Sequence, residues 1–235
     1  MNNGIIVASL VVAGLGLGVI TTGCTTSNSC KKGGTRMESS EFYKDGKFDQ
    51  AKAKLAYFDL MTHFNVPIYP ALKKDDGFFW AVDFGKGDFM KYGMAGVFWA
   101  NEEKEGYFGH EIYLLPGQSI PEHKHLPTQN KEGKVIRCKM ESWQVRHGYV
   151  YGFSEVGEDN LDQFPEAKAM LSKVQVPYLK SRHVQKWEAD GKVHKLAKDE
   201  TWHFMMAGSE GAIVTEYATF HDGAGLRFSV PGVSL

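Results

Sequence analysis

The sequence lacks a basic tract, is poor in cysteine, and contains no apolar run long enough to span a membrane unaided. Its 235 residues carry a net charge of −1, so nucleic acid and anionic membrane surfaces are not expected partners. Of its three cysteines, Cys24 and Cys30 lie in the N-terminal segment and Cys138 in the domain, which does not predict a disulfide framework. The longest apolar run, residues 5–20, has 16 residues, whereas a transmembrane helix needs about 20.

This N-terminal run ends at the tetrapeptide TTGC, a pattern typical of an export signal. It resembles a signal-peptide core followed by a bacterial lipoprotein cleavage box, with Cys24 as the acylated residue. We therefore expect a signal peptide over residues 1–23 and a flexible tether over residues 24–40. The protein is expected to be exported, as a membrane-anchored lipoprotein or a periplasmic protein, rather than cytoplasmic. Any membrane contact would then be made through this signal or its lipid anchor.

The remaining chain is long enough for one domain with a sizeable core, since 43% of the residues are hydrophobic. Apolar residues recur at helical spacing between Phe48 and Phe64, at positions 48, 51, 55, 58, 61 and 64. This spacing predicts an amphipathic helix, which we place in an N-terminal lead-in over residues 41–76. The following NVPIYP ends the helix, because proline cannot continue its hydrogen-bond ladder.

After residue 76 the pattern changes to short segments rich in aromatic and β-branched residues, separated by glycine, proline or charged turns. Such segments predict strands. They lie at residues 77–85, 95–102, 106–117, 140–155, 193–220 and 226–230. The stretch LDQFPEAKAML (residues 161–171) is expected to be a short helix or an insertion loop. We therefore predict a mainly β domain over residues 77–235, folded as a β-barrel or jelly roll with the N-terminal helix on its side.

The tetrapeptide EHKH carries the strongest indication of a site. In a strand, His123 and His125 lie on one face and Lys124 on the other, so the two imidazoles can share one divalent metal ion. An isolated pair of this kind also arises by chance. Two further residues therefore matter: Glu141 lies on an otherwise apolar strand face, and His203 lies among apolar neighbours.

Each of these residues has a simpler interpretation on its own, such as a hydrogen-bonded core histidine at position 203. Their combination in a mainly β chain predicts a metal site of three histidines and one glutamate. The gap between His125 and Glu141 contains the insertion LPTQNKEGKVIRCKM, and its Glu132 is a rival for the carboxylate ligand. Such a ligand set suits Mn²⁺, Fe²⁺, Co²⁺, Ni²⁺ or Zn²⁺.

The stretch PGQSIPEHKH…MESWQVRHGYVYGF resembles the first conserved motif of the cupins. In it a glycine (Gly117) precedes the paired histidines, and a glutamate and a second glycine (Gly148) follow them. His203 stands where the second cupin motif has its histidine. More specifically, residues 78–232 resemble the D-lyxose isomerase group, and the closing GAIVTEYATFHDGAGLRF is similar to the end of that group. The resemblance implies a cupin-type barrel, an aldose–ketose isomerase and bound Mn²⁺.

Such an enzyme would interconvert an aldose of the D-lyxose or D-mannose type and its ketose. The reaction passes through an enediolate, whose charge a divalent metal ion stabilises. Two other interpretations remain open: another metal cupin enzyme, such as an oxygen-dependent dioxygenase, and a non-catalytic sugar-binding cupin of the cell envelope. A homodimer is compatible with the resemblance, but no residue of the sequence demonstrates one.

The isomerase hypothesis also predicts which residues act on the sugar. Glu216, in the apolar strand AIVTEYATF, is the candidate base, and we expect burial to raise its pKa. His110 occupies the position that matches a lysine of the isomerases and is the second candidate catalytic residue. The candidate substrate-binding residues are Trp143, as an aromatic wall, and the turn residues His221, Asp222 and Arg227. A simpler interpretation of Glu216 is a salt bridge to Arg227.

Overall fold

The computed structural model describes residues 37–235 of the chain. The predicted signal peptide and most of the predicted tether, with Cys24, lie outside the described residues. Within residues 37–235, no helix combines the length and the apolar character needed to cross a bilayer.

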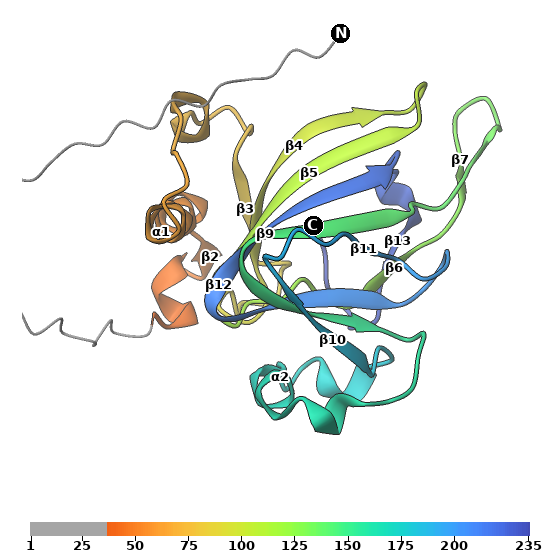
Figure 1. Ribbon diagram of the computed structural model, residues 1–235. Coiled ribbons are helices and arrows are strands. Elements are labelled where there is room, and N and C mark those ends of the chain that lie inside the picture. Colours follow the sequence, from red (N-terminus) through yellow and green to blue (C-terminus); the bar gives the residue numbers. More distant parts are fainter. Residues whose placement is uncertain (1–36) are drawn as a thin grey trace, which may run out of the picture. The chain divides into compact units, whose positions relative to one another are not determined.

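The domain is mainly β, as the sequence predicts, and its largest element is an antiparallel sheet of nine strands that curls into a barrel (Figure 1). Six strands run in the order β10-β9-β12-β5-β4-β3, β11 pairs with β9, and β6 lies between β12 and β13. These strands are β3 (Trp80–Val82), β4 (Met94–Glu102), β5 (Tyr107–Leu114), β6 (His123–His125), β9 (Glu141–Ser154), β10 (His183–Glu188), β11 (His194–Lys195), β12 (His203–Thr219) and β13 (Leu226–Phe228). Two hairpins lie outside this sheet: β1 (Tyr43–Lys44) with β2 (Lys47–Phe48), and β7 (Thr128–Gln129) with β8 (Val135–Ile136).

The long strands β9 and β12 pair along most of their length and bend together. Their register shifts between Ala207 and Ala212 of β12, opposite Gly148 of β9. Gly148 has φ +68°, and a Cβ atom there would lie 2.1 Å from the carbonyl oxygen of Gly211. Only glycine fits this bend, which gives a structural reason for the glycine that follows Glu141 in the sequence motif.

The predicted N-terminal helix exists, and the face that it buries coincides only in part with the predicted stripe. Helix α1 spans Gln50–His63, and Asp49 caps it by accepting a hydrogen bond from the backbone N–H of Lys52. Its buried residues are Ala53, Ala56, Tyr57, Leu60 and Met61. Of the interior positions in the predicted stripe only Met61 is buried, and Leu55 is 62% exposed. Phe48, Phe58 and Phe64 of the stripe are partly buried against the same core, so the stripe was right at one edge. It missed the centre of the buried face because apolar residues occupy two adjoining faces of this helix, and spacing alone does not rank them.

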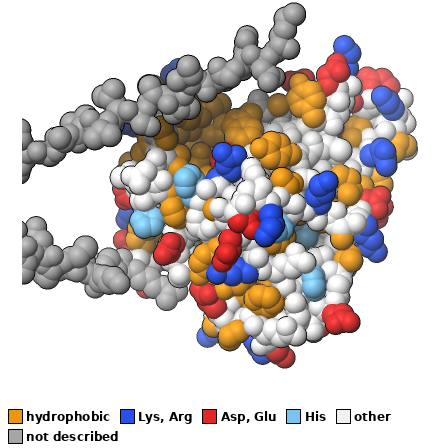
Figure 2. Space-filling view, viewed as in Figure 1, with side chains coloured by type: hydrophobic (Ala, Val, Ile, Leu, Met, Phe, Trp, Pro, Cys, Tyr) orange, Lys and Arg blue, Asp and Glu red, His pale blue; other side chains and the backbone are white. Residues whose placement is uncertain are grey.

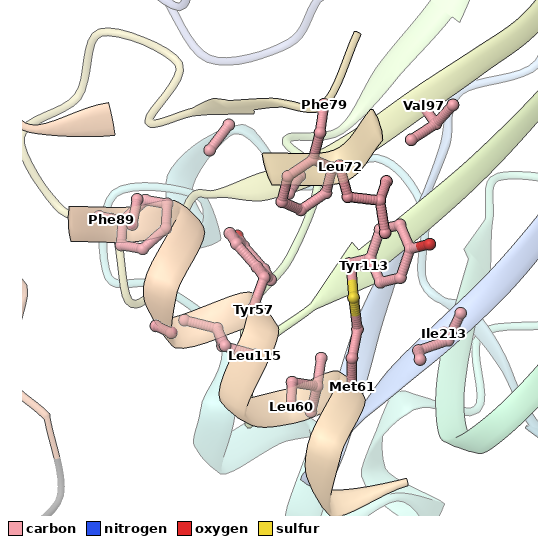
Figure 3. Packing of buried hydrophobic residues seen from close by; sticks show 14 of the residues in the cluster. Tyr57, Leu60, Met61, Leu72, Phe79, Phe89, Val97, Tyr113, Leu115 and Ile213 are labelled. Atoms are coloured by element: carbon pink, nitrogen blue, oxygen red, sulfur yellow. The ribbon is translucent and has the colours of Figure 1, made fainter. Parts of the chain in front are cut away.

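Helix α1 covers the outer face of the sheet near one end of the barrel. Figure 3 shows Tyr57, Leu60 and Met61 directed at the aromatic and aliphatic side chains that this end of the sheet presents. These partners come from β3, β4, β5 and β12 and from their connecting loops, and they include Phe79, Phe89, Val97, Tyr113 and Ile213. The outer core therefore clamps one end of the sheet, while a second apolar cluster fills the barrel interior.

Residues 155–182 leave the barrel between β9 and β10, and we call them the 155–182 segment. It contains helix α2 (Pro165–Met170), which confirms the short helix expected there, and the 3-10 helices η3 (Leu161–Gln163) and η4 (Val176–Tyr178). The remaining 3-10 helices are η1 (Ser39–Phe42), η2 (Pro70–Lys73) and η5 (Gly223–Gly225). Strand β10 was not predicted from the sequence, because its HVQKWE mixes charged and apolar residues. On the face seen in Figure 2, side chains of both charge signs are interspersed over the domain.

Candidate metal centre and its cavity

Strand β6 places its two histidines inside the barrel. His123 and His125 are buried, whereas Lys124 lies on the opposite face, as strand alternation predicts. The neighbouring strand β12 begins at His203, which pairs directly with His123 in the antiparallel register. Three imidazoles therefore meet at one point because β6 and the start of β12 lie side by side.

Glu141, the first residue of β9, completes the group. One of its carboxylate oxygens lies 3.3 Å from Nε2 of His125, and the other lies 2.7 Å from Nε2 of His203. One ligand atom from each of Glu141 and the three histidines can be chosen so that all four atoms lie within 4.8 Å of one another. All four side chains are buried. The structure thus brings together the four residues that the sequence suggested.

Neighbouring backbone groups orient two of the imidazoles. Nδ1 of His123 lies 2.9 Å from the carbonyl oxygen of Pro121, and Nδ1 of His203 lies 2.8 Å from that of Thr201. When each Nδ1–H donates to its carbonyl, Nε2 carries a free lone pair that points to the centre of the group. Burial, with the neighbouring His203 and His125, holds the pKa of His123 well below its usual range, so this imidazole is neutral at pH 7.

The donor set also passes a test of fit for a cation. Nε2 of His125, Nε2 of His203 and one oxygen of Glu141 are buried and form no hydrogen bond, although the last two atoms lie only 2.7 Å apart. Buried polar atoms without partners are rare in folded proteins because their desolvation is costly. A divalent cation bound to these atoms would compensate them, so the group is able to hold one. Glu132 is no longer a rival, since it lies exposed in the turn between β7 and β8.

A second carboxylate, Glu216 of β12, lies beside this group. Glu216 pairs across the sheet with His110 of β5 on one side and Trp143 of β9 on the other, and all three face the cavity. Nδ1 of His110 lies 3.5 Å from a carboxylate oxygen of Glu216. His110 is itself enclosed by the rings of Trp80 and Phe98. The two candidate catalytic residues are therefore in contact.

Lys139 is the residue that reasoning from the sequence missed. Its ammonium group lies 2.9 Å from Glu141 and forms an ion pair with Glu216, and the side chain is only 6% exposed. The sequence contained a signal for it, since Lys139 and Glu141 are two residues apart and extended backbone directs both to the same side. The resemblance to the isomerases matches a lysine to the position of His110, which precedes the histidine pair; the lysine in this cavity is Lys139, which follows the pair.

The charge of Lys139 changes the expected behaviour of Glu216. Burial by itself raises the pKa of this carboxyl, as we expected, but Lys139 and His110 outweigh burial and bring the pKa below its usual value. The expectation of a raised pKa was therefore wrong, because it considered burial without the partner charge. The alternative partner was also wrong: Glu216 pairs with Lys139 and not with Arg227.

The four candidate substrate-binding residues divide into two pairs. Trp143 and His221 line the cavity, and burial lowers the pKa of His221 to about 4, so its ring is neutral at pH 7. Asp222 instead accepts a hydrogen bond from Thr128 and caps η5. Arg227 is exposed on the outer face of β13, where its guanidinium donates to two backbone carbonyls. The structure does not bring the last two to the cavity.

Comparisons with known proteins agree with this architecture. No protein-family model matches the chain. A protein named D-lyxose/D-mannose isomerase from Thermosediminibacter oceani is 28% identical over 193 residues, which cover 81% of this chain and 94% of that protein. A D-lyxose ketol-isomerase from a Thermofilum species is also 28% identical, over 58% of this chain and 68% of its own length.

Solved structures of similar fold include L-ribose isomerases. The structure from Cellulomonas parahominis matches 78% of this chain and 92% of its own, with a TM-score of 0.56 and 16% identity. The structure from an Acinetobacter species with bound L-ribose matches 77% and 91%, with a TM-score of 0.56 and 14% identity. This likeness establishes the fold: the domain is a cupin-type barrel, as predicted from the sequence.

Proposed function

We propose that the protein is a metal-dependent aldose–ketose isomerase acting on a sugar of the D-lyxose or D-mannose type. The observation that carries the proposal is the juxtaposition, in one buried cavity, of a His₃Glu group with a second carboxylate. The names of the relatives from Thermosediminibacter oceani and Thermofilum support the class of substrate. The resemblance seen in the sequence favours Mn²⁺, although the same ligands suit other divalent ions.

His123, His125, Glu141 and His203 would hold the metal ion. Bound there, a divalent cation would polarise the oxygens on C1 and C2 of the sugar and lower the energy of the enediolate. The nearby residues would then have separate tasks. These residues are Glu216 on β12, His110 on the neighbouring strand β5, and Lys139, which precedes β9.

Glu216 would act as the base that takes the proton from C2 and returns it to C1, while a second proton passes from the hydroxyl on C2 to the oxygen on C1. Its lowered pKa keeps it ionised in the free protein, and Lys139 holds the carboxylate in position. When the sugar binds, the ammonium group of Lys139 can turn part of its hydrogen bonding to a sugar oxygen. Loss of part of the hydrogen bonding from Lys139 would make Glu216 more basic when the sugar is bound. The same ammonium group would then stabilise negative charge on the sugar oxygen. His110 would hold the other oxygen of Glu216.

The aromatic walls have a separate role. Trp80, Phe98 and Phe108 surround His110 and the ammonium group of Lys139. Apolar walls displace water, so the hydrogen bonds and charges inside act at greater strength.

The test is turnover that depends on metal. The full chain is stripped with a chelator and reloaded with Mn²⁺, and ketose formation from D-lyxose, D-mannose and L-ribose is measured before and after. We expect ketose from D-lyxose or D-mannose only in the reloaded protein. Tight Mn²⁺ binding without ketose from any of the three sugars would overturn the isomerase assignment and leave a metal site of another function.

The proposal extends to where the enzyme acts. The TTGC box supports export with acylation at Cys24, which would place the reaction outside the cytoplasm. Cys24→Ser should abolish labelling of the protein by a radioactive fatty acid in cells, and unlabelled wild-type protein would contradict the anchor. Light scattering of the purified protein tests whether it forms a homodimer.

A further inference from the structure

Glu122, next to the first histidine of the candidate metal centre, has an unusual environment. It is 0% exposed, although its side chain is a carboxylate. None of the ion pairs among residues 37–235 includes it. A carboxylate that is fully buried without a cationic partner is costly unless hydrogen bonds compensate it. Such a group in a fold calls for a reason.

Backbone N–H groups provide that compensation. One oxygen of Glu122 accepts hydrogen bonds from the N–H of Lys180 at 2.9 Å and from that of Ser181 at 2.6 Å. The other oxygen lies 3.5 Å from Nε2 of Gln175, a residue that is 2% exposed. All three partners belong to the end of the 155–182 segment. The side chain of Glu122 thus ties this segment to the chain just before β6.

The backbone of Glu122 is held as well. Its N–H donates to Oε1 of Gln175 at 3.3 Å, and its carbonyl oxygen accepts from the N–H of Ser229 at 3.0 Å. Gln175 also donates to the hydroxyl of Ser229 at 3.1 Å. Glu122 therefore joins the chain just before β6 to the 155–182 segment and to the residue that follows β13.

The neighbours of this junction are the metal-ligating groups. His123 follows Glu122 directly, and its ring is oriented by the carbonyl of Pro121, which precedes Glu122. His123 also pairs in register with His203 and with Phe228 of β13. A shift of the backbone at residue 122 would therefore move the ring of His123 relative to the ligand across from it.

We propose that Glu122 is a positioning residue for the metal centre: its carboxylate fixes the backbone that carries His123 and thereby sets the affinity for the metal ion. It touches neither the metal-binding atoms nor the substrate. The inference rests on the metal site of the proposed function and does not depend on which sugar is bound. The length of the Glu122 side chain matters as well as its charge, because one of its oxygens must reach the N–H groups of both Lys180 and Ser181.

The experiment measures Mn²⁺ binding to the stripped full chain by titration calorimetry, beside thermal unfolding of the same metal-free samples. Glu122→Ala is expected to raise the dissociation constant about 10- to 100-fold, the usual effect of losing a group that orients a ligand. Glu122→Gln keeps an oxygen that can accept both N–H bonds, so it should stay near the wild-type affinity. Glu122→Asp keeps the charge but withdraws it by one methylene, and it should fall between the other two.

Glu166 provides the matched control. It lies on α2 of the same segment, and its carboxylate accepts hydrogen bonds from Tyr149 at 2.7 Å and Tyr151 at 2.6 Å, which binds the segment to β9 and not to β6. Glu166→Ala should lower the unfolding temperature while leaving Mn²⁺ affinity at the wild-type value.

The outcomes separate the inference from the function beneath it. Wild-type affinity in Glu122→Ala would overturn the positioning role, as would an equal loss of affinity in Glu166→Ala. If Glu122→Ala does not fold, Glu122→Asp decides, since wild-type affinity in that variant would also overturn it. Absence of Mn²⁺ binding by the wild-type protein would instead contradict the metal site itself.

Discussion

The cavity has two halves that share Lys139 and each hold one buried glutamate, but the groups around the two glutamates differ. Around Glu141 lie three imidazoles, and several acceptor atoms there have no donor. Around Glu216 lie His110 and a cage of aromatic rings, and the ammonium group of Lys139 already compensates the carboxylate. Two glutamates at similar burial are thus prepared for different partners.

The difference indicates how one barrel can bind a cation and move a proton side by side. The half around Glu141 has a surplus of lone pairs, which a divalent cation would take up. In the half around Glu216 the carboxylate is compensated by Lys139 without any added ion, although Nε2 of His110 also has no hydrogen-bond partner there. Lys139 lies between them and keeps two negative groups from repelling each other.

The largest effect is expected from removing a ligand in the first half. In His203→Ala, affinity for Mn²⁺ should fall by more than the roughly 10- to 100-fold that loss of an outer partner costs, and turnover should fall with it. Calorimetric titration and the ketose assay measure the two quantities on one preparation. His63→Ala, at an exposed histidine in the last turn of α1, is the control and should change neither. Unchanged Mn²⁺ affinity in His203→Ala would mean that the half around Glu141 is not the one that binds the cation.

Breaking the second half should affect turnover alone. Glu216→Gln is expected to lower kcat by about 10²- to 10⁴-fold, the range for loss of a general base, while Mn²⁺ still binds as in the wild type. Glu111→Gln is the matched control, because Glu111 also lies on this part of the sheet but bonds to Thr215 on the outer face. Retained turnover in Glu216→Gln would exclude it as the base.

The contrast between the halves also explains which site residues the sequence could predict. His123 and His125 were recognised because strand alternation fixes which way alternate side chains point, and this rule needs no knowledge of the neighbouring strands. Lys139 obeys the same rule with Glu141. Lys139 was not recognised because it lies in the insertion after His125, one residue before the predicted strand over residues 140–155. A buried lysine is recognisable only once its two carboxylate partners are known to converge.

Other errors have the same origin in missing tertiary context. Existence of the helix at residues 50–63 followed from local spacing, but which face it buries depends on the sheet that α1 meets. Arg227 was assigned to the cavity because its turn ends near the barrel mouth. In β13, however, Arg227 pairs with Lys124, and both lie on the face opposite to the histidines. The pairing register of β13 with β6 determines which way the Arg227 side chain points, and this register cannot be deduced from spacing in the sequence.

A smaller effect should come from the outer core, which lies outside both halves. Leu60→Ala shortens a side chain of α1 that is buried against the sheet, and it should lower the free energy of unfolding by about 2–5 kcal/mol. Leu55→Ala, on the face first chosen from the spacing, should change it by less than about 0.5 kcal/mol. Chemical denaturation of the metal-free protein measures both. Equal losses would mean that α1 is buried on both faces.

The smallest effect is expected among the residues that follow β12. His221 lines the cavity and Arg227 does not, so the same truncation should separate them. His221→Ala removes a neutral hydrogen-bonding group and should raise KM by up to about tenfold, as for one lost hydrogen bond, with kcat little changed. Arg227→Ala should leave kcat/KM within about twofold of the wild type, as for most surface substitutions. A larger loss in Arg227→Ala than in His221→Ala would mean that Arg227 faces the sugar. The pairing of β13 with β6 opposes this, because it places Arg227 beside Lys124, on the face opposite to the two histidines.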